Sequence, residues 1–289
     1  MPDSLYSLVA EPEAKSPVLL MHLKGWIDAG SAAALAADSI VGQLAPVTTV
    51  VEFDDDALVD YRSRRPTMHL NDGHIDGLVW PRIEIAHGRL ADADFLVLRG
   101  AEPDRHWRKF ATAVVDLARM FGVTKILGIG AFPSPVPHTR PTNVVSTSTN
   151  RALIEAIGHN NTRMEVPAGV HAAIEVEAGA RRMPAATLWA AVPHYVAAMD
   201  YPEGARALVS ALSGLVDVDF DVSLLARAGD TNKRHIDELV AADPQHIEML
   251  AALEAHVDQM EASRDSAVPD ADELAFEIEA FLRDPDNPR

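Results

Sequence analysis

The chain has 289 residues, of which 48% are hydrophobic and none is cysteine. This composition predicts a globular protein with a substantial core, and the lack of cysteine excludes disulfides, thiolate zinc sites and cysteine nucleophiles. The formal net charge of −18 argues against a general binder of nucleic acids or anionic membranes, because those surfaces need clustered lysine and arginine. No apolar run approaches the ~20 residues of a membrane span, and no export signal is visible. We therefore expect a cytoplasmic protein that contacts neither nucleic acid nor membrane.

The most informative segment is a strand, a tight turn and a helix near the N-terminus. Residues 18–23 form an apolar run that predicts a buried strand, and residues 31–44 have apolar side chains at helical spacing. The turn between them, residues 25–30, has glycine at both ends. Proteins of this α/β sandwich class bind ligands at the carboxyl ends of their strands. Trp26 and Asp28 are therefore candidates for a ligand site, although Asp28 could instead bond to amides of its own turn.

Residues 59–93 depart from the alternation of strands and helices. Residues 67–70 and 74–80 flank Asn-Asp-Gly and predict a β-hairpin, which residues 82–86 could extend by a third antiparallel strand. An exposed apolar hairpin often seats against another subunit, whereas packing on its own domain is equally compatible with the pattern. The candidate contact residues are Met68, Leu70, Leu78 and Trp80.

The alternation of strands and helices otherwise continues through residues 1–217, which we interpret as one α/β core domain. Its further strands are expected at 47–53, 95–98, 125–129, 144–149 and 187–192. Its further helices are expected at 104–121, 150–157, 170–183 and 202–215.

Residues 218–289 predict a C-terminal helical extension. Helices are expected at 221–228, 231–242 and 243–262, followed by a polar linker at 263–271. A last helix would present Leu274, Ile278, Phe281 and Leu282 on one face. The extension could be a lid over the carboxyl edge of the sheet, or it could complete the core.

A proline-rich loop at residues 132–141 should lie at the same edge as Asp28. It carries His138 and Arg140, and the guanidinium could clamp a carboxylate or a phosphate or form a salt bridge that locks the loop, for example to Asp28. His194 and Tyr195 end a later strand and could act as a proton donor and an orienting hydroxyl, or pack under a loop. The candidate ligand-binding residues are thus Trp26, Asp28, His138, Arg140, His194 and Tyr195.

No complete catalytic motif accompanies these candidates. The chain contains no G-x-G-x-x-G, no phosphate-binding G-x-x-x-x-G-K-[ST], no H-E-x-x-H and no G-x-S-x-G sequence. We therefore expect no cofactor and no metal, and the motifs leave open whether the protein is an enzyme.

Three segments together resemble the signatures of the proteasome assembly chaperone 2 family: the turn at 25–30, the glycine strand and proline-rich loop at 128–141, and Val-Pro-His-Tyr at 192–195. The resemblance implies a three-layer α/β/α core related to purine nucleoside phosphorylases. It also implies a homo-oligomer, with a trimer favoured, and a chaperone role in which proteasome subunits are partners. The helical tail at 219–282 resembles the extension of the actinobacterial branch.

The end of the chain departs from that family pattern. Archaeal chaperones of this kind dock through a hydrophobic-tyrosine-x tail, whereas this sequence ends Asp286-Asn287-Pro288-Arg289. Docking by that route is therefore not expected. The preferred hypothesis is an oligomeric binding or chaperone-like protein. The alternative is a phosphorylase-like or hydrolase-like enzyme with a small-molecule pocket at the carboxyl edge of the sheet.

Overall fold

The computed structural model describes residues 5–158 and 165–266. Its strands are β1 (Tyr6–Leu8), β2 (Val18–Lys24), β3 (Thr48–Phe53), β4 (Thr67–Asn71), β5 (His74–Val79), β6 (Ile83–Leu90), β7 (Ala93–Ala101), β8 (Lys125–Ser134), β9 (Val144–Ser148) and β10 (Ala185–Pro193). Its helices are α1 (Ala32–Val41), α2 (Asp55–Leu58), α3 (Trp107–Met120), α4 (Arg151–Ile157), α5 (Val170–Ala180), α6 (Pro202–Val216), α7 (Ser223–Ala241) and α8 (Pro244–Ser266), with short 3-10 helices η1 (Ala29–Ser31) and η2 (His194–Val196).

The centre of the described part is an eight-stranded sheet in the order β1-β3-β6-β7-β2-β8-β10-β9. Strands β7, β2, β8 and β10 run parallel to their neighbours in this group. Antiparallel pairs join β7 to β6, β6 to β3 and β3 to β1 on one side, and β10 to β9 on the other. The carboxyl ends of the four parallel strands therefore meet at one edge.

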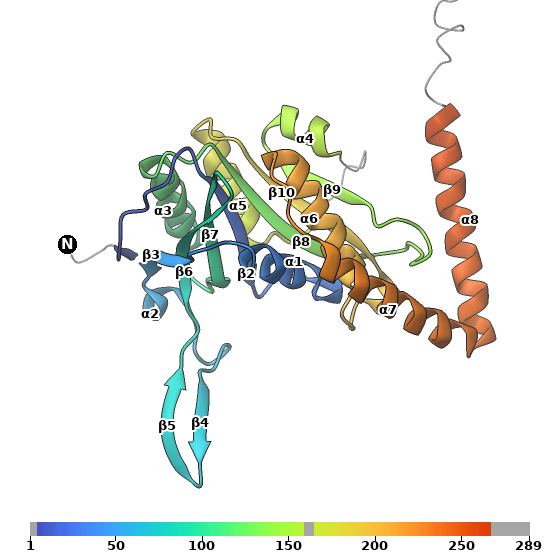
Figure 1. Cartoon of the computed structure of the whole chain (residues 1–289), viewed down its shortest axis with the longest axis horizontal. Coiled ribbons are helices and arrows are strands. Elements are labelled where there is room, and N and C mark those ends of the chain that lie inside the picture. The colour runs from blue at the N-terminus through green and yellow to red at the C-terminus, as the bar shows by residue number, and fades with distance from the viewer. Residues whose placement is uncertain (1–4, 159–164, 267–289) are drawn as a thin grey trace, which may run out of the picture.

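Helices cover both faces of the sheet (Figure 1). Because strand residues alternate between faces, Leu20 of β2 packs with α1 and α6, whereas Leu19 and Met21 pack with α3 and α5. Each layer contains fully buried side chains, for example Leu188 on one face and Phe110 on the other. The predicted three-layer α/β/α sandwich is confirmed.

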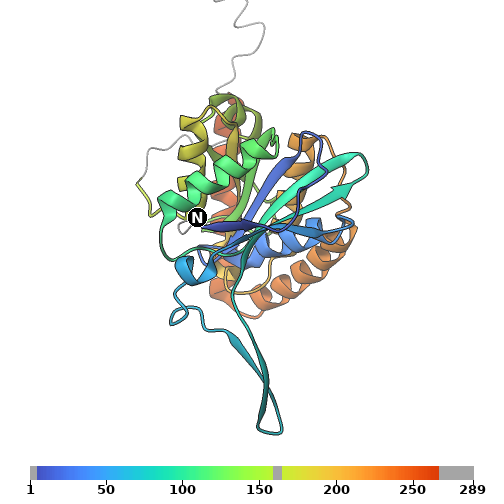
Figure 2. The same cartoon turned by 90° about the vertical axis from the view of Figure 1, so that its left-hand side faces the viewer.

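Strands β4 and β5 form a separate two-stranded sheet, which we call the arm (residues 67–79). The arm projects from the body in both views (Figures 1 and 2) and does not pack on its own domain. Residues 82–86 do not extend it, and that expectation is wrong: residues 83–86 belong to β6, which pairs with β3 and β7 in the central sheet. Buried Ile83 and Ile85 place β6 in the core.

The C-terminal extension forms two long helices. Residues 223–241 are one uninterrupted helix, α7, so the predicted break between 228 and 231 is wrong. The chain passes through that point because Gly229 is buried against Glu203 of α6. Helix α8 continues to Ser266, four residues into the expected linker. The predicted last helix and the chain end at 286–289 lie outside the described residues. Among the residues described, no helix has both the length and the apolar character needed to cross a membrane.

Candidate functional site

The turn after β2 holds the start of α1 in place. Gly30 has a φ of 63°, and a Cβ there would lie 2.6 Å from the Cβ of Tyr201, so the position requires glycine. The Asp28 carboxylate accepts hydrogen bonds from the backbone N–H of Ala33 at 2.8 Å and of Ala34 at 3.0 Å. Both of its oxygens therefore satisfy amides at the helix start that would otherwise have no partner. Of the two roles expected for Asp28, the bonding within its own turn is the one observed.

The three sequence signatures meet at the carboxyl edge of the sheet. Asp28 forms a parallel bridge with Ala131 of β8. The Gly30 N–H donates to the carbonyl of Ala197 at 2.8 Å, and the Tyr201 N–H donates to the Gly30 carbonyl at 2.8 Å. The turn after β2 is thus bonded to β8 and to the segment that follows β10.

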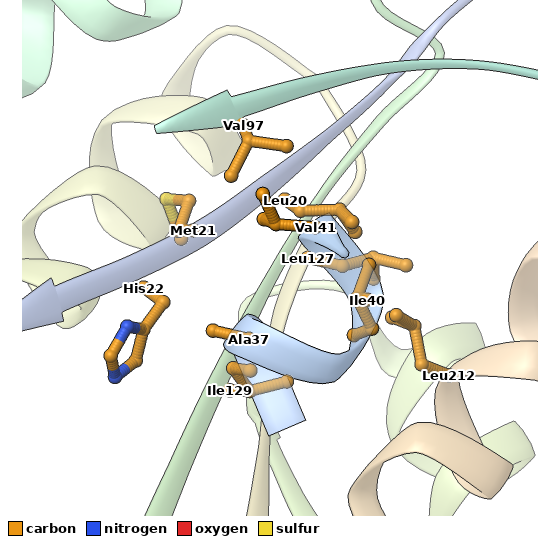
Figure 3. Close-up of a pocket in the computed structure, with 10 residues that line it drawn as sticks. All are labelled: Leu20, Met21, His22, Ala37, Ile40, Val41, Val97, Leu127, Ile129 and Leu212. Atoms are coloured by element: carbon orange, nitrogen blue, oxygen red, sulfur yellow. The ribbon is translucent and has the colours of Figure 1, made fainter. Parts of the chain in front are cut away.

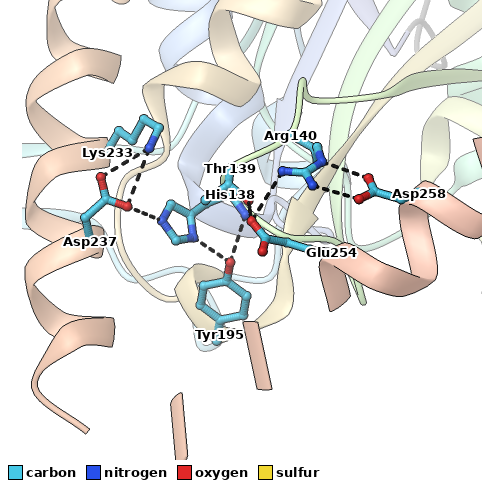
Figure 4. Close-up of polar contacts among 8 residues, drawn as sticks. All are labelled: His138, Thr139, Arg140, Tyr195, Lys233, Asp237, Glu254 and Asp258. Atoms are coloured by element: carbon cyan, nitrogen blue, oxygen red, sulfur yellow. Dashed lines mark hydrogen bonds and ion pairs between the residues drawn. The ribbon is translucent and has the colours of Figure 1, made fainter. Parts of the chain in front are cut away.

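His138 lies at the centre of a chain of hydrogen bonds between the proline-rich loop and the C-terminal helices (Figure 4). The Tyr195 hydroxyl accepts from the His138 backbone N–H at 2.8 Å and lies 2.7 Å from the ring Nδ1, while Nε2 lies 2.9 Å from Asp237 of α7. A neutral ring with its hydrogen on Nε2 satisfies every one of these contacts. Burial raises the pKa of Tyr195 to about 12, and the hydrogen bond from His138 lowers the pKa of Asp237. The imidazole therefore joins α7 to the loop.

Arg140 joins the same loop to α8. Its Nε and Nη2 each donate to Asp258 at 2.9 Å, and Nη1 donates to Glu254 at 3.3 Å (Figure 4). The Thr139 hydroxyl also donates to Glu254. The hydrogen bonds from Arg140 lower the pKa of Asp258. Of the two roles considered for Arg140, the structure therefore has the salt bridge that locks the loop. The carboxylates belong to α8, however, and a salt bridge to Asp28 is not formed.

Trp26 and His194 lie at the surface of this edge. The Trp26 side chain is 44% exposed, and its ring covers Gly169, where a Cβ would lie 2.9 Å from Cδ1. His194 is exposed and packs edge-to-face on Tyr195 with ring centroids 5.4 Å apart. The structure therefore groups His138, Arg140, His194 and Tyr195 around the loop.

A second polar cluster, between α5 and the sheet, was not predicted as a site. The buried Glu175 carboxylate accepts from the hydroxyl of Thr187, and Thr147 donates to it at 3.4 Å. Burial raises the pKa of Glu175 to about 7 and lowers that of His171 to about 4. The Nε2 atom of His171 is enclosed without a hydrogen-bond partner. A threonine inside the apolar run of β10 is one sequence signal for this cluster.

The cavity drawn in Figure 3 is small. It has a volume of about 20 Å³, lies between α1 and the sheet, and is lined by apolar side chains and the imidazole of His22. Burial lowers the pKa of His22. This volume has room for about one water molecule. Among the described residues, no group of three or more His, Cys, Asp or Glu side chains could hold a metal ion.

The geometry therefore defines a three-layer α/β/α protein in which the loop after β8 is bonded to the C-terminal helices through His138, Thr139 and Arg140. The PAC2 family model matches residues 22–240, which is more than half of the chain. The chain belongs to the PAC2 family.

Solved structures from actinobacteria have the same fold. A protein of unknown function from Mycobacterium tuberculosis is 32% identical, with a TM-score of 0.83, and the match covers 92% of each chain. A protein of unknown function from Corynebacterium glutamicum is 29% identical, with a TM-score of 0.83, covering 89% of this chain and 97% of that one. A Mycobacterium tuberculosis proteasome-assembly chaperone homologue is 31% identical, with a TM-score of 0.74, covering 81% of this chain and 99% of that one. A search of curated proteins finds no match.

Proposed function

We propose that this chain is a chaperone-like binding protein that works as a homo-oligomer, and that the arm forms the contact between its copies. The observation that carries the proposal is the apolar face of the arm. Met68 pairs with Leu78 across the two strands, and Leu70 pairs with Ile75. Residues paired directly across the strands share a face, and the intervening pair, His69 with Gly77, faces the other way. The register shifts between His69 and Leu70, so that Leu70 pairs with Ile75 and not with Asp76.

This apolar face is open to solvent. The exposed fractions are 47% for Met68, 57% for Leu70, 58% for Ile75 and 44% for Leu78. Burying such a side chain from full exposure stabilises by roughly 1.5–3 kcal/mol. Because these four are about half exposed, a partner that covers them gains roughly half of that for each. At the base of the arm, Trp80 packs edge-to-face on Tyr61 with centroids 4.8 Å apart, which fixes the arm to the body. A trimer is the assembly that we favour.

Membership of the PAC2 family and the 31% identity to a proteasome-assembly chaperone homologue support proteasome subunits as the protein partner. The place of action would then be that of the partner, which we take to be the cytoplasm. The relatives from Mycobacterium and Corynebacterium support a place in an actinobacterial branch of the family. We also propose residues 1–217 as the core domain and the C-terminal helices as its lid.

Size-exclusion chromatography with light scattering tests the role of the arm. The double variant Met68→Ser/Leu78→Ser removes the central apolar pair, so its mass should fall to that of one chain at concentrations where the wild type is an oligomer. Met120→Ser/Leu224→Ser is the matched control, because these side chains are 58% and 76% exposed outside the arm. If the arm variant keeps the wild-type mass, the arm is not the contact.

A second candidate function is a small-molecule site at the loop of residues 135–143, supported by the grouping of His138, Arg140, His194 and Tyr195 there. Trp26 and Asp28 would complete it at the neighbouring turn. A ligand that binds the native state raises the melting temperature by mass action. We expect any such rise with nucleosides, phosphates or carboxylates to be lost in Arg140→Ala. A rise that persists in Arg140→Ala would place the ligand elsewhere.

A further inference from the structure

Exposed basic side chains gather where the arm leaves the body, at the carboxyl ends of β7 and β2. We call this set the basic collar: Lys24, Arg62, Arg65, Arg105, Arg108 and Lys109, all of them exposed. Two contacts hold its segments together. Arg64 donates to the Lys24 carbonyl at 2.8 Å, and the Asp60 N–H donates to Asp104 at 2.8 Å.

Most of this charge is not neutralised within the described chain. Arg105 lies 3.9 Å from Asp60. The other members of the collar form no ion pair with any residue in the described ranges 5–158 and 165–266. Arg108 and Lys109 also stand in the first turn of α3, where the helix dipole disfavours positive charge. The chain has only 25 Lys and Arg against 43 Asp and Glu. Asp60 and Asp104 lie among the collar residues, but two carboxylates against six exposed cations leave this surface basic on an otherwise acidic chain.

A cleft of about 540 Å³ lies at the same base, where β3 ends and β6 begins. Its acidic side chains are Glu52, Asp54, Asp55, Asp56 and Glu84, and its one basic side chain is Arg82. Glu52 pairs with Arg82 at 3.6 Å and Glu84 with Arg99 at 2.7 Å, so the net negative charge of the cleft comes from the three aspartates. Tyr61 and Trp80 form its aromatic wall, with Trp80 45% exposed. Aromatic faces and carboxylates both attract guanidinium groups. We call this feature the acidic cleft.

We propose that the basic collar of one copy packs against the acidic cleft of a second copy. This inference rests on the proposed self-association and names the polar surfaces that surround the apolar arm. The partner is a second copy because the same chain carries both complementary surfaces. Both surfaces lie at the base of the arm, which is the proposed contact between copies. Complementary patches at such positions fix the register of an interface and speed encounter. They also allow closed symmetry, either reciprocally in a dimer or head to tail in a ring.

Charge reversal tests this pairing by light scattering over a concentration series. Arg62→Glu/Arg65→Glu reverses the collar, and Glu52→Lys/Asp56→Lys reverses the rim of the cleft. Each double variant should weaken self-association at least tenfold, because like charges then face each other. The quadruple variant, which reverses both surfaces in one chain, should recover association. The control is Arg151→Glu/Glu155→Lys on α4, an exposed ion pair with side chains 92% and 64% exposed, which should leave association unchanged.

The outcomes separate this pairing from the proposed function. If Met68→Ser/Leu78→Ser dissociates the oligomer but neither charge reversal weakens it, the collar–cleft pairing is wrong and the arm contact remains supported. If the quadruple variant folds but does not recover self-association, the pairing is also wrong. A wild type that stays monomeric throughout overturns both. If a charge-reversal variant unfolds, two other measurements test the pairing: self-association of Arg65→Gln and a salt titration of the wild type. The pairing requires weaker self-association in both, because Arg65→Gln removes a collar charge and salt screens exposed charges.

Discussion

The Asp28 carboxylate holds the start of α1 by accepting hydrogen bonds from Ala33 N and Ala34 N. We expect Asp28→Ala to lower the free energy of unfolding by about 1 kcal/mol, the usual cost of losing such a cap. Urea denaturation followed by circular dichroism measures this. Asp38→Ala, at an exposed position of the same helix, is the matched control. Equal stability of the two variants would contradict a capping role for Asp28.

Glu175 should make stability depend on pH. Burial raises its pKa from 4.5 to about 7, so the native state holds the proton more tightly than the unfolded state does. The resulting stabilisation is complete below pH of about 4.5 and is lost as the pH rises through about 7. Relative to Glu175→Gln, the wild type should therefore lose on the order of 2 kcal/mol between pH 5 and pH 8. His171 titrates in both proteins, so its opposite contribution cancels in the difference.

Denaturation of both proteins at several pH values checks this prediction. Glu155→Gln makes the same chemical change at a side chain that is 64% exposed, and its difference from the wild type serves as the baseline. A Glu175→Gln difference that stays constant with pH would mean that Glu175 is ionised throughout.

At the scale of single residues, the sequence indicated which side chains belong to the candidate site better than it indicated which groups they contact. Glycine on both sides of Asp28 indicated a tight turn, and bonds within that turn were one of the two roles considered. The partners of His138 and Arg140 could not be predicted, because Asp237 and Asp258 lie 99 and 118 residues further along the chain. Such pairs depend on the packing of whole helices, which local patterns do not contain.

At the scale of elements, α8 is attached to the body largely by polar contacts. Arg140 and Thr139 bind Glu254 and Asp258, while most of the described apolar positions of α8 are only partly covered. We expect Arg140→Ala to expose α8 to proteases, with cleavage within 244–266 several times faster than in the wild type, because local opening controls cleavage. Limited proteolysis with mass spectrometry measures this.

The matched control for that experiment is Arg151→Ala, which breaks an exposed ion pair on α4 and should leave the rate within 244–266 unchanged. Equal rates in wild type and Arg140→Ala would show that the clamp does not hold α8. That result would also remove the polar basis for a lid at this edge.

The elements themselves were predictable where apolar periodicity was strong. The strand at 18–23 and the hairpin around Asn-Asp-Gly fall where the pattern put them. The extended segment at 82–86 was assigned to the wrong sheet, because alternation shows that a strand exists but not which strand it pairs with. The break expected near Gly229 is absent, since tertiary packing against Glu203 outweighs the low helix propensity of glycine.

At the scale of the whole molecule, the arm and α8 mark two different ends (Figure 1). The arm carries exposed apolar pairs beside a basic collar and an acidic cleft, whereas α8 bonds to the loop after β8 through Glu254 and Asp258. The fold class followed from alternating strands and helices, but a surface that needs a partner could be recognised only once exposure was known. We infer that the arm end serves association.

The most direct test of the chaperone-like role is to mix the purified chain with purified proteasome ring subunits and follow complex formation and ring assembly by native mass spectrometry. The account predicts a stoichiometric complex with subunits before rings close, faster ring formation, and loss of both effects in Met68→Ser/Leu78→Ser. Rings that form at the same rate with and without the chain, with no complex at micromolar concentrations, would contradict it.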